Sequence, residues 1–400
     1  MSRNKWLLSL FALCFFVSRA NDSYVFVKSA KRATDTNWTI IGAGPAGIVT
    51  IGLLLDLGIP GQDITWIDPQ FNVGRLGQYY ESVPGNTKNK VFISFLESCK
   101  TFQEIKTPSM DALLSLDLEK EFPLSTIIEP LRDITKHLSS KVRCVQGMLT
   151  GFQFEEDAWE VSVSTNDGAP LKSIISEHVV LATGSHPRAG DYQCETTIPL
   201  DIALDKQALA QQINPQDSIA VIGSSHSAIL ILKFLSELKV KRIINFYKNP
   251  IIYAVDMGTW VLHGSAGLRG IAAEWAREVL EKNPPANILR LQNTQEHRDA
   301  WLSVCNKIIY AIGYERNALP AVDGNPELNY DDKTGIIAPR LFGIGIAFPE
   351  KYIDPLGNVE HRIGLNSFMD YAQRMVPQWI TKDTRVRFSS FEDFFTIDAL

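Results

Sequence analysis

One stretch of sequence decides the fold, WTIIGAGPAG at residues 38–47. A short run of β-forming residues ends at Ile41 and runs directly into a turn of the form G-x-G-x-x-G. Gly42 permits the tight turn, Gly44 lets the backbone approach a pyrophosphate, and Gly47 lets the following helix pack closely on the strand. The free N–H groups at the start of that helix attract phosphate. The predicted cofactor contacts here are Gly42, Gly44, Pro45, Ala46 and Gly47.

The residues that follow complete a strand–helix–strand unit. Ile48 to Leu57 is an apolar stretch of helical length, and residues 63–68 read as a second strand. Asp68 stands at the end of that strand, 26 residues after Gly42, where an acid would hold the ribose hydroxyls. Strand, turn, helix and acid together predict a dinucleotide site. The alternative is a glycine-rich turn with no ligand.

A second copy of this unit lies at residues 218–248. The strand 218–222 runs into GSSHSA at residues 223–228, a helix is expected from Ser227 to Leu238, and a strand from Arg242 to Tyr247. Lys248 stands where an NAD site has an acid, and its charge favours a 2′-phosphate, so this copy predicts NADP. A degenerate unit that has lost its nucleotide is the alternative. The predicted contacts are Gly223, Ser224, Ser225, Ser227 and Lys248, and His226 is either a phosphate contact or a solvent-facing residue.

Together the two copies predict an α/β chain with two Rossmann-like domains, each built on a parallel sheet. The second domain is inserted in the first. Between them, helical patches are expected to be broken by Pro108, Pro123 and Pro130, and a pair of antiparallel strands to turn near residues 155–157. The predicted divisions are a signal peptide (1–20), a linker (21–36), the first dinucleotide-binding domain (37–184 and 313–385), the NADP-binding domain (185–312) and a tail (386–400).

The N-terminus has the layout of a secretory signal peptide. Arg3 and Lys5 precede an apolar run of twelve residues, Trp6 to Val17, interrupted only by Ser9, and small residues at Ser18 and Ala20 suit a cleavage site. As a helix that apolar run would span about 18 Å, short of a hydrocarbon core of about 30 Å. We therefore expect export to a periplasm, an endoplasmic reticulum lumen or the outside of the cell. An uncleaved membrane anchor and an inert tail are the alternatives.

Composition narrows the class of partner. The 400 residues carry a net charge of −6, which argues against nucleic acid as a main ligand because phosphates usually need a basic face. The five cysteines are scattered singly, without the C-x-x-C pair of a redox dithiol and without zinc-like spacing. One disulfide is conceivable in an exported protein, but the sequence does not assign it. We expect a small-molecule substrate and no metal.

At this point the chain resembles a known group, the flavoproteins with two dinucleotide-binding domains, and within them the class B and N-hydroxylating monooxygenases. The resemblance spans about residues 38–378. It rests on both glycine turns, on the turns ATG at 182–184 and AIGY at 311–314, and on the returning strand that ends at Gly345. It implies FAD on the first turn, NADP on the second, and a catalytic asparagine, Asn86, near the flavin. The further cofactor contacts that it implies are Arg75, Gly77, Ala182, Thr183, Gly184, Gly313 and Gly345.

Two departures from that group keep other functions open. Ile346 stands where related flavoproteins usually have an aspartate, and the segment 198–203 lacks the histidine of the group's fingerprint. The leading hypothesis is an NADPH-using FAD monooxygenase of a small nucleophilic substrate. A flavin reductase or dehydrogenase that does not oxygenate is the second, and a flavin-bound regulatory protein with little turnover is the third. Arg269, in a glycine-rich piece at 263–270, is either an anion contact beside the substrate or part of an ordinary loop.

Overall fold

The computed structural model describes residues 34–322 and 328–381. Its first sheet has the strand order β18-β19-β8-β1-β2-β5, in which the strands from β19 to β5 run parallel. Two further strands, β6 and β7, continue antiparallel from β8. The bounds are β1 (Thr36–Ile41), β2 (Ile64–Asp68), β5 (Arg143–Gln146), β6 (Met148–Glu155), β7 (Ala158–Ser164), β8 (Ile174–Leu181), β18 (Ile336–Ala338) and β19 (Leu341–Gly343).

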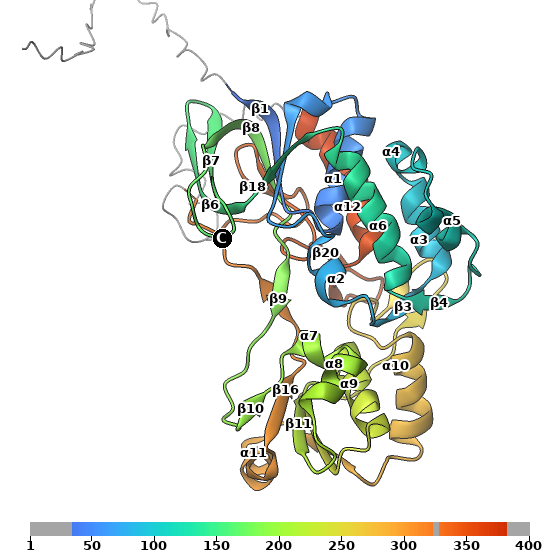
Figure 1. Cartoon of the computed structure of the whole chain (residues 1–400). Coiled ribbons are helices and arrows are strands. Elements are labelled where there is room, and N and C mark those ends of the chain that lie inside the picture. The colour runs from blue at the N-terminus through green and yellow to red at the C-terminus, as the bar shows by residue number, and fades with distance from the viewer. Residues whose placement is uncertain (1–33, 323–327, 382–400) are drawn as a thin grey trace, which may run out of the picture.

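Helices cover one face of this sheet and leave the other to the β6–β7 ribbon (Figure 1). The first helix, α1, lies between the sheet and other helices, which is why it is apolar nearly all round. Gly52 lets α4 come close, because a Cβ there would lie 2.6 Å from the Phe102 ring. The bounds are α1 (Pro45–Asp56), α3 (Asn89–Glu97), α4 (Lys100–Gln103), α5 (Pro108–Leu114), α6 (Ser125–Ser139) and α12 (Leu365–Thr381).

The second sheet is parallel throughout, in the order β10-β16-β11-β12-β15. It forms the lower lobe of Figure 1, with α9 and α10 against one face. The strands are β10 (Thr196–Thr197), β11 (Ser218–Ile222), β12 (Arg242–Tyr247), β15 (Ile288–Gln292) and β16 (Lys307–Tyr310). The helices are α7 (Leu200–Ala203), α8 (Lys206–Gln212), α9 (His226–Glu237), α10 (Gly270–Trp275), its π-helical continuation (Ala276–Glu281) and α11 (Gln295–Trp301).

The chain crosses between the two sheets twice, and the crossings lie side by side (Figure 1). Strand β9 (Ser185–Pro187) pairs antiparallel with β17 (Tyr314–Arg316). The Asn317 side chain donates a hydrogen bond to the Thr183 carbonyl (2.8 Å) and joins the ends of the two crossings. The expected fold class, two Rossmann-like units with the second placed within the first, is confirmed. The domain boundaries given above stay a prediction.

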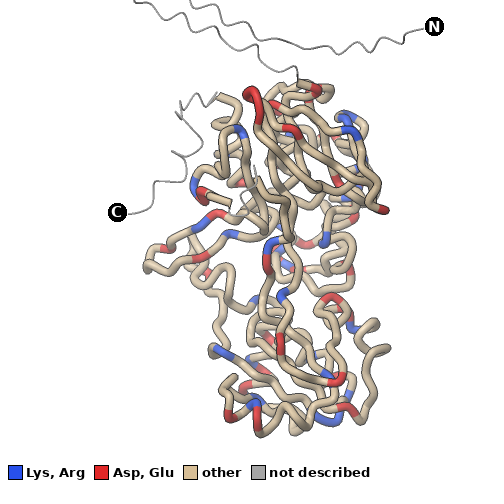
Figure 2. Tube along the Cα trace, turned by 90° about the vertical axis from the view of Figure 1, so that its left-hand side faces the viewer, with Lys and Arg blue, Asp and Glu red and all other residues tan. Residues whose placement is uncertain are grey.

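Smaller elements occupy the junction between the lobes and the end of the first one. They are a short helix, α2 (Gly74–Tyr79), and three two-stranded antiparallel sheets. The sheets are β3 (Pro84–Lys88) with β4 (Glu121–Pro123), β13 (Val255–Asp256) with β14 (Val261–Leu262), and β20 (Glu350–Ile353) with β21 (Val359–Arg362). Two 3₁₀ turns complete the chain, at Gly61–Asp63 and Leu302–Val304. Figure 2 shows Lys and Arg interspersed with Asp and Glu along both lobes.

The structure corrects two details. The break expected at Pro130 is wrong, because α6 continues through this residue to Ser139. Proline deprives the helix of one hydrogen bond only, and the buried face that includes Ile127 and Leu131 holds the helix together. The first strand begins at Thr36, inside the expected linker. The predicted signal peptide and tail fall outside the described residues, and none of the described helices is long and apolar enough to cross a bilayer.

Candidate functional site

The first glycine turn is held by backbone contacts that exclude side chains. Gly42 has a φ of +110°, and a Cβ there would lie 2.2 Å from the Ala182 carbonyl oxygen. A Cβ on Gly47 would lie 1.9 Å from the carbonyl oxygen of Gly42. Real atoms do not approach so closely, so packing alone requires glycine at both positions.

Gly44 differs from its two neighbours in this turn. Its backbone is extended, with a φ of −78° and a ψ of 178°, which any residue adopts. A Cβ on Gly44 would meet only the Cα of Gly74, at an ordinary 4.0 Å. Gly44 is the N-cap of α1, Pro45 follows at its first turn, and no side chain caps this helix end. The open space at an uncapped helix N-terminus fits the pyrophosphate of FAD.

Two distant segments converge on the same helix end. The chain after β19 brings Gly345 to this helix end. A Cβ on Gly345 would lie only 2.6 Å from the Cβ of Ala46. The start of α2 brings Gly74, where an added Cβ would lie 3.0 Å from the Cα of Gly44. The structure thus brings the predicted residues 42–47 and 345 together. Gly77 has a packing role instead, since its Cβ would lie 2.4 Å from the Asn72 carbonyl oxygen.

Asp68 lies directly beneath the turn and is 7% exposed. One carboxylate oxygen accepts the N–H of Ala43 at 2.7 Å, and the other accepts the N–H groups of Gln70 (2.8 Å) and Phe71 (2.7 Å). Asp68 therefore builds the turn as well as standing where a ribose would lie. Its ribose contact stays a prediction.

The turn at residues 182–184 contains a polar side-chain atom without a hydrogen-bond partner among the described residues. Ala182 extends β8 and faces the turn, and Thr183 follows it with a buried hydroxyl that has no partner among the described residues. Leaving a buried hydroxyl unpaired costs roughly 1–3 kcal/mol, so such an atom marks a place where a ligand can bind. Gly184, the third residue of the motif, accepts the N–H of Asn317 at 3.2 Å.

Arg75 contacts the other lobe. Its guanidinium forms an ion pair with Asp201 on α7 and lies 4.5 Å from the centroid of the Tyr79 ring. Tyr80 donates to the same carboxylate at 2.8 Å and lies 3.0 Å from the hydroxyl of Tyr314. Burial is the main cause that raises the pKa of Tyr80 well above its ordinary value, and the neighbouring Tyr314 is the second. This hydroxyl therefore keeps its proton. Sequence reasoning missed this cluster, because Asp201 is distant in the chain and only the fold brings it to Arg75.

Asn86 lies on β3, at the junction between the lobes, and is half-buried. Its side-chain oxygen accepts the Thr87 hydroxyl at 3.2 Å, and β3 packs against α10 of the second lobe. On the neighbouring β4, Glu121 lies against the start of α10, since a Cβ on Gly270 would meet its carboxylate at 2.0 Å. Burial first, and repulsion from Glu274 next, raise the pKa of Glu121 above its ordinary value. Arg269 opposes this shift by attraction.

The second glycine turn repeats the first in its packing. Gly223 has a φ of +130°, and a Cβ there would lie 2.2 Å from the Ala311 carbonyl oxygen. A Cβ on Gly42 would lie equally close to the Ala182 carbonyl oxygen. Ser225 is the N-cap of α9, the place that Gly44 has on α1, and its side chain makes no capping bond. Ser224 donates to the Asn249 carbonyl at 2.8 Å. Ser227 is half-buried in the first turn of the helix, and Gly313 follows the end of β16.

His226 opens α9, and its Nδ1 is buried without a partner among the described residues. Burial first, and the positive charge of Arg269 next, lower the pKa of His226 to about 4. The ring is therefore neutral at pH 7. The simple solvent-facing interpretation of His226 is wrong, and a role as a phosphate contact stays a prediction.

A second basic residue joins Lys248 at the end of β12. Lys248 is exposed directly after the strand. Arg290 lies opposite Asn245 in the paired strand β15, donates to its side-chain oxygen at 3.1 Å, and lies 4.9 Å from the centroid of the Tyr247 ring. Sequence reasoning missed Arg290, because the pairing of β12 with β15 is not visible in the local pattern.

A cavity of about 570 Å³ opens at the carboxyl ends of the strands in the second sheet. It is lined by residues 189–192 and by Ile222, Asn293, Tyr310 and Ile312. The strand order reverses between β11 and β16, and open α/β sheets bind nucleotides at such a place. Within residues 34–322 and 328–381, no group of His, Cys, Asp and Glu side chains could hold a metal ion.

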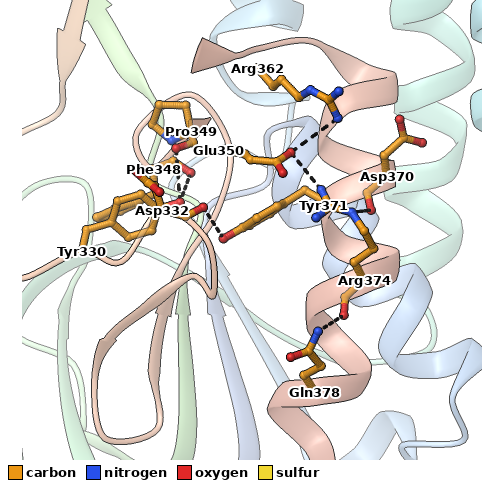
Figure 3. Close-up of polar contacts among 10 residues, drawn as sticks. All are labelled: Tyr330, Asp332, Phe348, Pro349, Glu350, Arg362, Asp370, Tyr371, Arg374 and Gln378. Atoms are coloured by element: carbon orange, nitrogen blue, oxygen red, sulfur yellow. Dashed lines mark hydrogen bonds and ion pairs between the residues drawn. The ribbon is translucent and has the colours of Figure 1, made fainter. Parts of the chain in front are cut away.

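Ion pairs and tyrosines fix the chain that follows Gly345 (Figure 3). Glu350 bridges Arg374 of α12 at 2.8 Å and Arg362 of β21 at 3.7 Å. Tyr330 donates to the Phe348 carbonyl at 2.7 Å, and Tyr371 donates to the Asp332 carbonyl at 3.2 Å. These contacts fasten the chain after Gly345 to β21 and α12, and α12 in turn packs against α1.

Comparison with known proteins agrees with this geometry. Residues 36–339 match the family model described as pyridine nucleotide-disulphide oxidoreductase. A fungal protein, "Monooxygenase AgnR1" of Paecilomyces divaricatus, is 32% identical over 382 residues, which cover 85% of this chain and 97% of the relative.

Two solved structures share the fold at low sequence identity. A flavin-containing monooxygenase from Stenotrophomonas maltophilia has a TM-score of 0.57 and 14% identity over 87% of this chain and 99% of its own. A bacillithiol disulfide reductase from Bacillus cereus has a TM-score of 0.54 and 13% identity, with the same shares of each chain covered.

Proposed function

The chain belongs to the pyridine nucleotide-disulphide oxidoreductase family, and we propose that it is a monooxygenase that uses FAD and NADPH to oxygenate a small nucleophilic substrate. The family and the monooxygenase relative confirm the expected enzyme class, an FAD-dependent oxidoreductase that uses a pyridine nucleotide. One observation carries the assignment of FAD to the first turn. Packing does not require glycine at position 44, which is the N-cap of α1, and no side chain caps this helix end.

The residues around the first turn have distinct roles in this proposal. The start of α1 at Pro45 and Ala46 faces the pyrophosphate, and the buried Thr183 hydroxyl gains a partner when the cofactor binds. Asp68 orients the turn through Ala43 and faces the adenosine ribose. Gly345 admits the middle of the cofactor beside Ala46. When bound, FAD would supply the redox chemistry, namely hydride acceptance and oxygen activation.

The second turn holds the reductant in this proposal. Gly223 and Ser225 face the pyrophosphate of NADPH, with Ser224 and Ser227 beside them, while Lys248 and Arg290 hold the 2′-phosphate. The neutral ring of His226 lies at the same helix end and donates or accepts a hydrogen bond without adding charge. Asn86, at the junction of the lobes, would hydrogen-bond the nicotinamide side of the site.

In this proposal the junction between the lobes would limit the access of water to the reacting atoms. Arg75, Asp201, Tyr80 and Tyr314 form a continuous polar contact between α2, α7 and the second crossing. Tyr80 is neutral over the whole working pH range, so it does not serve as a base. A dry site favours transfer of oxygen to the substrate over release of peroxide.

Isotope labelling tests the oxygenation step directly. The FAD-loaded protein is given NADPH, ¹⁸O₂ and a panel of sulfides, amines and ketones, and products and hydrogen peroxide are both measured. We expect one labelled oxygen atom in at least one product. Release of all consumed oxygen as peroxide with every compound would overturn the monooxygenase and support the reductase, which the missing histidine at residues 198–203 also allows.

For localisation we propose export through the N-terminal segment into a compartment that has its own NADPH, such as an endoplasmic reticulum lumen. The basic start at Arg3 and Lys5 and the apolar run from Trp6 support this. The intact mass of the protein made in its own host should correspond to a chain that begins at Asn21. A mass that retains residues 1–20 would contradict cleavage.

A further inference from the structure

Two cysteines meet at the edge of the second sheet. Strands β10 and β16 pair in parallel with Thr196 opposite Lys307. Cys194 and Cys305 each stand two residues before this pair in their own segments, Cys194 just ahead of a bend at Glu195. Neighbouring strands lie about 4.8 Å apart, and a disulfide bridges Cα atoms about 4.4–6.8 Å apart.

The contacts of the two thiols place their side chains close together. The Sγ of Cys194 lies 3.4 Å from the carbonyl oxygen of Cys305, and both side chains pack into the same apolar cluster around Tyr310. Burial first, and the neighbouring Cys194 next, raise the pKa of Cys305 to about 12. Cys194 is half-buried and therefore the more accessible of the two. Both are free thiols in the structure.

We propose that Cys194 and Cys305 are a modification site, at which a reversible disulfide fastens the edge strand β10 to β16. This inference is independent of the oxidoreductase activity. The other described cysteines offer no such pair, because Cys99 is buried under α1 and Cys144 lies exposed on β5.

Thiol–disulfide exchange with a small-molecule disulfide supplies the oxidant. The Cys194 thiolate attacks one sulfur of oxidised glutathione, forms a mixed disulfide and releases one reduced glutathione. Cys305 then gives up its proton and attacks the Cys194 sulfur, which forms the protein disulfide and releases the second glutathione. Two thiols are oxidised in total, and one glutathione disulfide is reduced to two thiols.

The disulfide acts on the wall of the cavity. Residues 189–192 line it and precede Cys194 directly. At present this wall is held by the Tyr310 hydroxyl, which accepts the N–H of Tyr192 at 2.8 Å, and by an edge strand of two residues. A covalent bond beside it would reduce the opening of the segment, because fewer open states remain accessible.

Mass spectrometry tests the proposal on the full-length protein. After incubation with oxidised glutathione, the intact protein should lose two hydrogens, and trypsin should release one crosslinked species of peptides 189–206 and 299–307. We expect amide exchange in residues 189–193 to slow and the melting temperature to rise by about 5 °C. Both changes should be absent in the Cys194→Ser variant, and both should persist in the matched Cys144→Ser control.

Three results would overturn the proposal. One is a stable glutathione adduct at Cys194 without the crosslinked peptide, and another is a crosslink that includes Cys144 in place of Cys305. The third is a Cys194–Cys305 crosslink that leaves amide exchange in residues 189–193 unchanged. The Cys305→Ser variant provides a further check, because it should retain the glutathione adduct on Cys194 and form no internal disulfide.

Discussion

Gly44 separates a requirement of the ligand from a requirement of the fold. A Cβ on Gly42 or Gly47 would overlap backbone oxygens, whereas one on Gly44 meets only the Cα of Gly74 at 4.0 Å. The sequence motif predicts all three glycines alike. Only the structure distinguishes the one that a cofactor explains, because the space around each Cβ depends on segments far along the chain.

The Gly44→Ala variant should therefore fold but bind FAD poorly. We expect the free energy of unfolding of the apoprotein to fall by no more than about 1 kcal/mol, because alanine is a poorer N-cap than glycine but its methyl group meets no atom closer than 4.0 Å. The affinity for FAD should fall by at least about tenfold, because the new methyl group fills the approach of the pyrophosphate. Urea unfolding and flavin fluorescence titration measure the two quantities.

The matched control is Gly151→Ala in β6, where a Cβ would meet Ser162 at an ordinary 3.7 Å, far from the turn. It should retain both stability and FAD. Full FAD binding by the Gly44→Ala variant would contradict the place that we assign to the cofactor.

His226 predicts a pH dependence of stability with a definite sign. Its pKa is about 4 in the folded protein and about 6.5 when unfolded, so the unfolded chain binds more protons between these values. Stability from this residue is complete above about pH 7 and is lost as the pH falls toward 4. Because the ring is only partly exposed, we expect a loss of about 2 kcal/mol.

Urea unfolding at pH 7 and pH 4.5 measures this loss in the wild type and in His226→Gln. The variant should lose less stability than the wild type on acidification, by about that amount. The exposed His361→Gln variant is the control and should behave as the wild type. An equal acid sensitivity of the wild type and His226→Gln would show that the ring is not held neutral.

At the scale of elements, the end of β12 sets the choice of nucleotide. Lys248 follows this strand and Arg290 lies on the strand beside it. The local pattern predicts the first residue, because it directly follows the strand. It cannot predict the second, which depends on how β12 and β15 pair.

Lys248→Ala should raise the KM for NADPH about tenfold and leave the KM for NADH unchanged, since only NADPH has the 2′-phosphate. Arg290→Ala should act in the same direction. Steady-state oxidation of NADPH and of NADH measures the two KM values and their ratio. Lys241→Ala, exposed at the opposite end of the strand, is the control and should change neither KM. An equal rise for both nucleotides would contradict a 2′-phosphate contact.

The helices show where local patterns mislead. Proline at position 130 predicts a helix break, but the buried face of α6 maintains the helix through it. Helix α12, which spans Leu365–Thr381, likewise continues through Pro377. In both cases burial against neighbouring helices outweighs the loss of one hydrogen bond.

At the scale of the molecule, two similar units were predictable because each repeats a local strand–turn–helix pattern. Gly42 with Ala182 and Gly223 with Ala311 make the same close contact in both units. What joins the units was not predictable, because the pairing of β9 with β17 and the contact of Arg75 with Asp201 depend on distant residues. The site where two cofactors would meet therefore belongs to the assembled molecule, whereas each cofactor turn belongs to one unit.

The central claim is that NADPH bound on the second unit reduces FAD bound on the first. Anaerobic titration of the FAD-loaded protein with NADPH tests it most directly, with the flavin absorbance near 450 nm as the readout. We predict bleaching of the flavin by one equivalent of NADPH, and faster bleaching than with NADH. A flavin that stays oxidised in the presence of excess NADPH would contradict the account.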